Sequence, residues 1–239
     1  MLHDHDLRGV DLPRRTLCLT YDDGPGPQTA ELGDYLAGRG IAATFFLIGE
    51  RARAQPEVVA QLRAAGHLVG NHTDTHPTLV SFLRDGGDVV AELARADAAI
   101  GADGATFFRP PYGYWRDDAP GGDPAVSPVA AALNASGRFP HLVGPVGWDV
   151  DARDWQFWRE GGSAEACGRA YLAAIEAAGG GIVLMHDGGE TPALRDGNRA
   201  LELARWLVPR LEDRGYRFAR LDAVLPTGPG FTGRDSPRE

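Results

Sequence analysis

The chain of 239 residues contains no lysine, and its 24 basic residues are outnumbered by 33 acidic residues, which gives a formal net charge of −9. A nucleic-acid-binding protein needs a basic footprint, so this balance argues against nucleic acid as a partner. Cysteine is scarce as well, since Cys18 and Cys167 are the only two. They match neither a metal-site spacing nor a disulfide framework. Because each lies in an apolar stretch, we expect two buried thiols rather than a disulfide.

Long apolar runs are also missing. The longest run, residues 41–48, is far too short to cross a bilayer, so no transmembrane segment is expected. Residues 1–15 lack the apolar core of a signal peptide. As written, the sequence predicts a cytoplasmic protein, or an exported protein if a leader has been removed. The sequence does not indicate an oligomeric state.

What the chain does contain is an alternation of short apolar runs and amphipathic segments, with 43% apolar residues to build a core. Strands are expected at residues 16–21, 43–48, 67–70, 106–108, within 142–148, at 181–185 and at 216–219. Helices are expected at residues 28–38, 56–66, 89–100, 128–135, 164–178 with Ser163 as N-cap, and 200–211, where Pro209 should bend the helix or disturb its last turn.

Repeated strand–helix units indicate an α/β fold with a parallel sheet, and six or seven units suggest a closed or nearly closed barrel. We expect one domain over residues 1–225 and a disordered tail, rich in glycine and proline, at residues 226–239. Residues 113–127 form a long predicted loop, which is either functional or a simple insertion.

Chemically capable residues follow the predicted strands. They are Asp22 and Asp23, His72 and His76, Arg109, the group Asp149, Asp151 and Asp154, and the pair His186 and Asp187. In a parallel barrel the carboxyl ends of all strands meet at one mouth, where active sites are built. Solvated surface charges would have no reason to follow strand ends. We therefore expect these side chains to converge on one site.

The sequence His72-Thr-Asp-Thr-His76 is the first chemical signal at this mouth. The i, i+4 spacing would place two imidazoles on one side of a helical turn. Two histidines and a carboxylate can hold a divalent ion with open positions for water and substrate. Either Asp22 or Asp23 could supply that carboxylate. The spacing alone is weak evidence, and the Asp-Asp pair at another strand end strengthens it.

The remaining residues suggest acid–base chemistry. One carboxylate could bind the metal while its neighbour takes a proton from a bound water, whose pKa the metal lowers. His186 could act as the opposite general acid, with an aspartate to orient and protonate its ring, or it could be a structural histidine at a strand end. Arg109 lies in the apolar sequence FFRPPYG and needs a carboxylate partner, whether its role is structural or catalytic.

Five short motifs, in order, resemble those of the polysaccharide deacetylases, the NodB-homology enzymes of carbohydrate esterase family 4. The motifs are TYDDGP (residues 20–25), HTDTH (72–76), RPPYG (109–113), DARDW (151–155) and LMH (184–186). The resemblance spans residues 17–221. It implies a distorted (β/α) barrel of about seven strands, a divalent metal, commonly zinc, and hydrolysis of an N-acetyl or O-acetyl group on an oligo- or polysaccharide.

The resemblance also implies a role for each matching residue. Asp22 resembles the general base, and Arg109 the arginine that pairs with it. Asp23, His72 and His76 resemble the metal ligands. The backbone N–H of Tyr112 is similar to the oxyanion donor, His186 resembles the general acid and Asp154 the aspartate that tunes it, and Trp155 and Leu184 resemble the walls of the acetyl pocket.

Some residues depart from the family pattern or match no part of it. Asp74 lies between the histidines, where the family more often has a bulky or neutral residue, and it could alter the local charge. Residues 113–146 exceed the family's minimal spacing and include Tyr114 and Trp115, which could stack on sugar rings at the mouth. Trp158 is expected in the core, and Asp149 is expected to be structural.

Two other functions are also compatible with the sequence. One is hydrolysis of a C–N bond in a small ureide or imide on the same fold. The complete Asp-His-His set and the LMH motif argue against the metal-free members of that group. The other is a non-catalytic sugar-binding domain, which would be expected to have lost Asp22 or His186.

Overall fold

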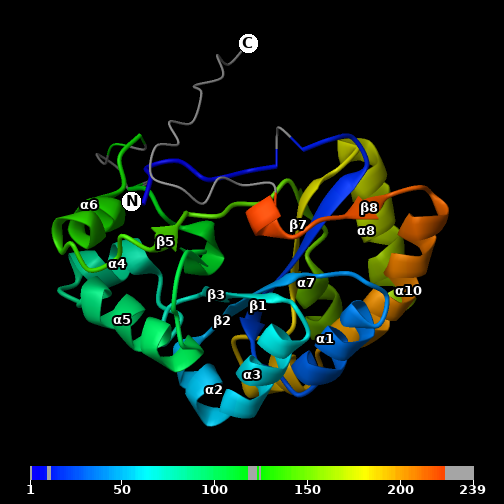
Figure 1. Ribbon diagram of the computed structural model, residues 1–239, viewed down its shortest axis with the longest axis horizontal. Helices are drawn as coiled ribbons and strands as arrows, with labels where there is room; N and C mark the ends of the chain where they lie inside the picture. Colours follow the sequence, from blue (N-terminus) through cyan, green and yellow to red (C-terminus); the bar gives the residue numbers. More distant parts are fainter. Residues whose placement is uncertain (1, 10–11, 118–122, 124, 224–239) are drawn as a thin grey trace.

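The computed structural model describes residues 2–9, 12–117, 123 and 125–223 (Figure 1). Eight strands lie in this part of the chain. They are β1 (Thr16–Gly24), β2 (Thr44–Leu47), β3 (Leu68–Asn71), β4 (Thr106–Phe107), β5 (Leu142–Val143), β6 (Val150–Asp151), β7 (Gly181–His186) and β8 (Arg217–Phe218).

Ten α-helices alternate with these strands in the same described residues. They are α1 (Thr29–Ala37), α2 (Gly49–Ala54), α3 (Pro56–Ala64), α4 (Leu79–Arg84), α5 (Val89–Ile100), α6 (Pro128–Ala135), α7 (Asp154–Arg159), α8 (Ala164–Ala178), α9 (Pro192–Asp196) and α10 (Ala200–Asp213). Two short 3₁₀ helices, η1 (Pro111–Gly113) and η2 (Leu221–Ala223), follow β4 and β8.

The main sheet is parallel and has the order β3-β2-β1-β7-β6, with β8 beside the start of β1. Strands β4 and β5 pair separately, and a single bridge between Asn71 and Phe108 joins them to β3. A second bridge, between Leu7 and Val146, adds the N-terminal segment after β5. The sheet therefore curves around most of a barrel without regular pairing at every position. This is the distorted barrel that the sequence predicts.

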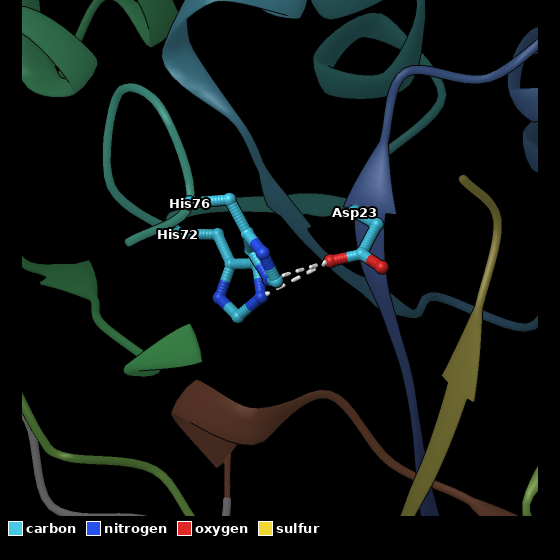
Figure 2. A group of neighbouring side chains, drawn as sticks. All are labelled: Asp23, His72 and His76. Atoms are coloured by element: carbon cyan, nitrogen blue, oxygen red, sulfur yellow. Dashed lines mark ion pairs between the residues drawn. The ribbon is translucent and has the colours of Figure 1, made fainter. Parts of the chain in front are cut away.

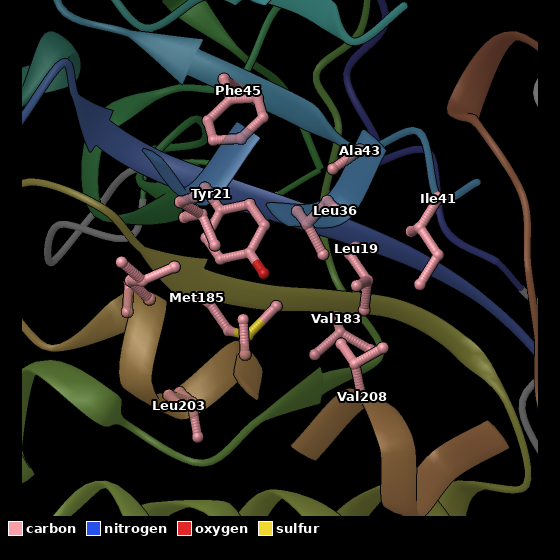
Figure 3. Packing of buried hydrophobic residues seen from close by; sticks show 14 of the residues in the cluster. Leu19, Tyr21, Leu36, Ile41, Ala43, Phe45, Val183, Met185, Leu203 and Val208 are labelled. Carbon is pink, nitrogen blue, oxygen red and sulfur yellow. The ribbon is translucent and has the colours of Figure 1, made fainter. Parts of the chain in front are cut away.

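Strand β1 lies at the centre of the sheet, and its side chains point alternately toward the surrounding helices and into the barrel. Leu19 and Tyr21 point outward and pack with Phe45, Val183 and Met185 under the surrounding helices (Figure 3). The helices that cover this main core include α1, α8 and α10, which lie together on one side of the molecule (Figure 1). Burial of this outer face holds β1 in register.

The opposite face of β1 points into the barrel. Cys18 packs there with Phe46 and Ile182, next to Thr20, and Asp22 follows at the strand end. A one-residue slip of β1 would move every one of these side chains to the wrong face. A separate apolar cluster, which includes Leu93, Phe108 and Trp115, lies under α4, α5 and α6. The polar end of β1, which includes Asp22, therefore lies in the barrel interior.

Most predicted elements are present, and the differences have local causes. Strand β1 continues three residues beyond its predicted end, through the polar pair that ends the apolar run. Helix α10 continues past Pro209 to Asp213. A helix-interior proline costs about 3 kcal/mol, and burial of Leu207, Val208 and Leu211 on the same helix offsets that cost. Helices α2, α4, α7 and α9 and strand β6 were not predicted.

Both cysteines are buried and free, as predicted, and burial raises the pKa of the Cys18 thiol to about 12. Across the described residues, no helix is both long and apolar enough to span a bilayer. The predicted tail at residues 226–239 lies outside the described residues, and the single domain over residues 1–225 stays a prediction.

Candidate active site

Two consecutive acidic residues end β1, and a bulge turns both of them toward one cavity. Neighbouring side chains in a regular strand point to opposite faces. Here the register with β2 shifts between Asp22 and Gly24, and Asp23 has a left-handed backbone with φ of 70°. Bulges of this kind re-aim a side chain at the end of a strand. Asp22 and Asp23 are both buried and line the same cavity, so two adjacent carboxylates can serve one site.

Asp23 meets the two predicted metal-binding histidines (Figure 2). Its Oδ1 atom lies 3.4 Å from His72 Nε2 and 3.0 Å from His76 Nε2. One ligand atom from each of the three residues lies within 4.8 Å of the others. The predicted helical turn, however, is wrong. Residues 72–76 form an irregular loop after β3, and Thr73 and His76 have positive φ angles that no α-helix contains.

The hydrogen bonding of His72 shows which ring nitrogen is available for a metal. Its Nδ1 atom lies 2.7 Å from the carbonyl oxygen of Arg109, which can only accept, so Nδ1 carries the proton. In the neutral ring, Nε2 then presents a lone pair to the Asp23 carboxylate, and two acceptors in contact repel unless a cation lies between them. One carboxylate and two imidazoles, with one ring oriented by a backbone carbonyl, fit a divalent ion such as zinc.

Asp22 is held by Arg109, which is completely buried inside the barrel. Arg109 Nη1 donates to Asp22 Oδ1 at 2.7 Å and to the Thr20 hydroxyl at 2.8 Å, and its other nitrogens donate to the carbonyl oxygens of Val146 and Gly147. The guanidinium also lies 4.3 Å from the centre of the Phe46 ring. A buried cation with all three nitrogens engaged fixes the orientation of the carboxylate that it pairs with.

His186 lies opposite Asp22, since the two residues are register partners on β7 and β1. Its Nδ1 atom lies 2.7 Å from Asp154 Oδ1, and its backbone N–H donates to Asp154 Oδ2 at 2.8 Å. Burial by itself lowers the pKa of His186, but the Asp154 carboxylate, with smaller contributions from Asp23 and Asp22, raises it to about 10. Because Asp154 engages Nδ1, the Nε2–H of a protonated His186 has no hydrogen-bond partner among the described residues and can act as a donor.

The two aspartates of β1 and the three histidines line a cavity of about 390 Å³, and Arg109 and Asp154 support them from outside its lining. Trp155 and Leu184 line it, as the sequence predicts, and so does Tyr112, whose backbone is left-handed at φ of 60°. The ring of Tyr112 packs edge-on against His76, with centroids 4.7 Å apart. The structure thus brings all ten predicted site residues together. Their catalytic roles remain predictions.

A comparison with known proteins places the chain in a family. The sequence pattern of the polysaccharide deacetylases matches residues 9–121. A chitooligosaccharide deacetylase of Sinorhizobium fredii is 36% identical over 209 residues, which cover 83% of this chain and 86% of that protein. The chain belongs to the polysaccharide deacetylase family. By this membership it is a hydrolase of the carbohydrate deacetylase class, and the predicted family and enzyme class are confirmed.

Two further comparisons agree with this assignment to the polysaccharide deacetylases. A peptidoglycan-N-acetylglucosamine deacetylase of Bacillus cereus is 28% identical over 217 residues, which cover 88% of this chain and 68% of that protein. The solved structure of the chitin deacetylase of Colletotrichum lindemuthianum matches with a TM-score of 0.67 and 26% identity, over 91% of this chain and 90% of that one. The predicted α/β fold, a distorted barrel, is thereby confirmed.

The cavity of this deacetylase has further lining residues that the motifs did not identify as part of the site. They include Trp148, Asp151, Trp158, Arg159, Glu190 and Leu194. Asp151 is one of the strand-end residues that the sequence predicts at this site, and the structure places it at the cavity. Trp148, Glu190 and Leu194 lie outside every motif, and only the folded barrel brings them to the mouth.

The residues that depart from the family pattern have varied outcomes. Tyr114 is exposed at the mouth. Trp115 is buried against Phe108 and donates to the His3 carbonyl oxygen, so the prediction that it could stack on a sugar is wrong. Trp158 packs in the core as predicted and also lines the cavity. Asp149 is structural, because its carboxylate accepts from the backbone N–H groups of Gly9 and Ile182. The predicted loop at residues 113–127 lies partly outside the described residues.

Asp187 is a buried acid behind the site that received no role from the motifs. Its backbone N–H donates to the Asp22 carbonyl oxygen at 3.1 Å, and its Oδ2 atom accepts from the Thr29 hydroxyl. Its Oδ1 atom has no hydrogen-bond partner among the described residues. Burial raises the pKa of Asp187 to about 7, against the opposing effect of the Thr29 hydrogen bond and with added repulsion from Asp23.

The raised pKa of Asp187 predicts how a neutral substitute changes stability with pH. A carboxyl whose folded pKa lies above its unfolded value stabilises the protein below the unfolded pKa of 3.8, and this contribution is lost as the pH rises through about 7. Asparagine does not ionise, so the Asp187→Asn variant does not lose stability in this way as the pH rises. We expect the variant's unfolding free energy, relative to the parent, to rise between pH 4 and pH 8 in metal-free urea titrations. The exposed control Asp103→Asn should show no such trend, and a pH-independent difference for Asp187→Asn would contradict the prediction.

Proposed function

We propose that this deacetylase removes the N-acetyl group from N-acetylglucosamine units of an oligo- or polysaccharide, with the help of a divalent metal. The relatives described above are named for chitooligosaccharides and for peptidoglycan N-acetylglucosamine, so N-acetylglucosamine is common to both. The same site could also hydrolyse an O-acetyl ester, because an ester carbonyl is attacked by water in the same way as the carbonyl of an acetamido group.

One observation carries the proposed chemistry. Asp22 and His186 lie side by side on adjacent parallel strands, and each is tied to a buried partner of opposite charge. Arg109 holds the Asp22 carboxylate in a charged pair, and Asp154 stabilises the protonated form of His186. A carboxylate held by a cation, next to an imidazole held by a carboxylate, is the expected arrangement for a general base and a general acid.

Asp23, His72 and His76 would hold the metal, and this donor set favours zinc. A divalent ion there would polarise the acetyl carbonyl and lower the pKa of a water molecule. Asp22 is the better base of the two aspartates, because Arg109 holds its Oδ1 atom, and its Oδ2 atom lies 3.8 Å from His72 Nε2, farther from the imidazoles than Asp23 Oδ1. Asp23 is the better ligand, because its Oδ1 atom approaches both imidazoles.

Hydrolysis consumes one water molecule and breaks the C–N bond of the amide. The water oxygen attacks the acetyl carbon, and Asp22 accepts a proton from that water. The Tyr112 backbone N–H donates to the developing oxyanion, which is an effective form of electrostatic catalysis in a closed site. His186 then gives its Nε2 proton to the departing nitrogen. The products are acetate and a free amino sugar.

The cavity walls support an acetamido group on a sugar as the substrate. Trp155 and Leu184 supply an apolar wall for the acetyl methyl group. At the mouth, the side chains of Tyr112 and Tyr114 are about half exposed, with ring centroids 6.3 Å apart. Exposed aromatic rings with a polar end suit the stacking of sugar rings.

Acetate release, measured together with the consumption of each ureide, separates this proposal from the alternatives, because hydrolysis of a ureide releases no acetate. The purified protein would be incubated with chitooligosaccharides, peptidoglycan, acetylated xylan and a panel of ureides, with and without a chelator. We expect acetate from the first two substrates, loss of activity with chelator and recovery with added Zn²⁺. Activity on a ureide alone would favour the C–N hydrolase, and a metal-binding protein inert on every substrate would favour a sugar-binding domain.

A further inference from the structure

Asp74 lies between the two predicted metal-binding histidines and turns away from them. It is buried, and its carboxylate pairs with two arginines, Arg53 Nη2 at 2.7 Å from Oδ1 and Arg95 Nε at 2.7 Å from Oδ2. Both arginine side chains are about half exposed. The charge that the sequence places between the histidines is therefore neutralised on the far side of the loop.

A second buried acid, Glu92 on α5, extends the same network. Glu92 Oε2 pairs with Arg95 Nη2 at 2.6 Å. Its Oε1 atom accepts from the Thr75 backbone N–H at 2.5 Å and from the Thr75 hydroxyl at 2.9 Å. Arg95 thus bridges a helix acid and a loop acid with two ends of one guanidinium, a geometry that the single ammonium of lysine cannot reproduce. We call Arg53, Asp74, Glu92 and Arg95 the loop-anchoring network.

The backbone of this loop needs such anchoring. Thr73 and His76 both have left-handed φ angles, of 66° and 62°, a conformation that residues other than glycine adopt only when their surroundings impose it. The Thr73 N–H is held at 2.8 Å by Asn71 Oδ1. From the other side, the backbone N–H groups of Gly49 and Glu50, at the start of α2, donate to the carbonyl oxygens of Thr73 and Asp74.

We infer that the loop-anchoring network holds His72 and His76 in metal-binding geometry before any metal arrives, and so raises the affinity of the site for a divalent ion. This inference rests on the metal site of the proposed function. Arg53, Asp74, Glu92 and Arg95 are positioning residues, because they act through the loop and touch neither metal nor substrate. Ligand-supporting partners of this kind typically contribute about 10- to 100-fold in metal affinity.

The sign of the charge change distinguishes positioning from simple electrostatics. A through-space effect would make Asp74→Asn weaken the binding of a cation and would make Arg53→Gln or Arg95→Gln strengthen it. Positioning requires all three substitutions to weaken binding, because each one breaks the same network. The half-exposed arginines also provide variants that leave the buried acids in place if Asp74→Asn fails to fold.

The experiment measures the dissociation constant for Zn²⁺ by competition with a chelator, in the parent protein and in these variants, with metal-free circular dichroism as a folding control. We expect Arg95→Gln to weaken binding about 10- to 100-fold, and Arg95→Lys to fall between that variant and the parent. Glu165→Gln and Arg169→Gln, which break an exposed pair on α8, should match the parent. If folded Arg95→Gln binds Zn²⁺ as tightly as the parent or more tightly, this inference is wrong but the proposed metal site is not affected. Absence of Zn²⁺ binding by the parent would overturn the proposed metal site as well.

Discussion

Asp22→Asn is expected to lower kcat by about 10²- to 10⁴-fold, the usual contribution of a general base, while the protein still binds its metal. Asparagine has nearly the same shape and can still accept the hydrogen bond from Arg109 Nη1, which in the parent spans 2.7 Å to Asp22 Oδ1. It cannot accept a proton from water at neutral pH. The loss should therefore fall on kcat, with little change in the substrate's KM.

The matched variant for this prediction is Asp23→Asn, one residue further along the chain. Asp23 faces both imidazoles, so its loss should weaken Zn²⁺ binding as well as activity. Metal content, acetate release and thermal unfolding would be measured for both variants, because Asp22→Asn leaves the buried Arg109 without a charged partner and lowers stability. A near-parental rate in Asp22→Asn, or loss of metal from it, would show that the two aspartates have been assigned the wrong roles.

The sequence predicts the long elements of this fold well, because their periodicity and caps extend over several turns. Helix α5 has the predicted bounds, and α8 begins after the predicted N-cap Ser163, whose side chain accepts from the Ala166 N–H. The helices that were missed, α2, α4, α7 and α9, have only five or six residues and bury at most two each. Such short segments contain less than two helical turns, too little for an apolar period to appear.

For the site, the sequence identifies the residues but not the backbone that brings them together. The motif HTDTH suggests a helical turn, yet the structure uses a loop with two left-handed residues. The Asp-Asp pair gives no sign of the bulge that turns both carboxylates to one cavity, because a left-handed aspartate depends on its tertiary contacts. The partners of Asp74 are invisible for the same reason. Arg53 and Arg95 lie about 20 residues away on each side of it, and α2 and α5 must pack before they meet it.

Asp154→Asn is expected to move the basic limb of the pH–rate profile to lower pH and to reduce the rate most strongly in alkaline solution. His186 can donate a proton only below its pKa, which the Asp154 carboxylate helps to raise to about 10. Without that charge, the effect of burial dominates and favours the neutral imidazole. The rate above the new pKa should fall about tenfold per pH unit, because each unit leaves a tenth of His186 protonated.

Two measurements make this second prediction specific to charge. Asp154→Glu keeps the carboxylate and should retain part of the high basic limb, although the longer side chain disturbs the 2.7 Å contact with Nδ1. An NMR titration of the His186 ring in metal-free protein should show its pKa lowered in Asp154→Asn. A bound cation would offset the contribution of Asp23 to that pKa, so the variants must be compared at equal metal loading.

Because the raised pKa of His186 stabilises the fold fully below 6.5 and loses this effect as the pH rises through about 10, Asp154→Asn should also be less stable than the parent at neutral pH. A rate that falls equally at every pH would instead mean that Asp154 only orients the ring.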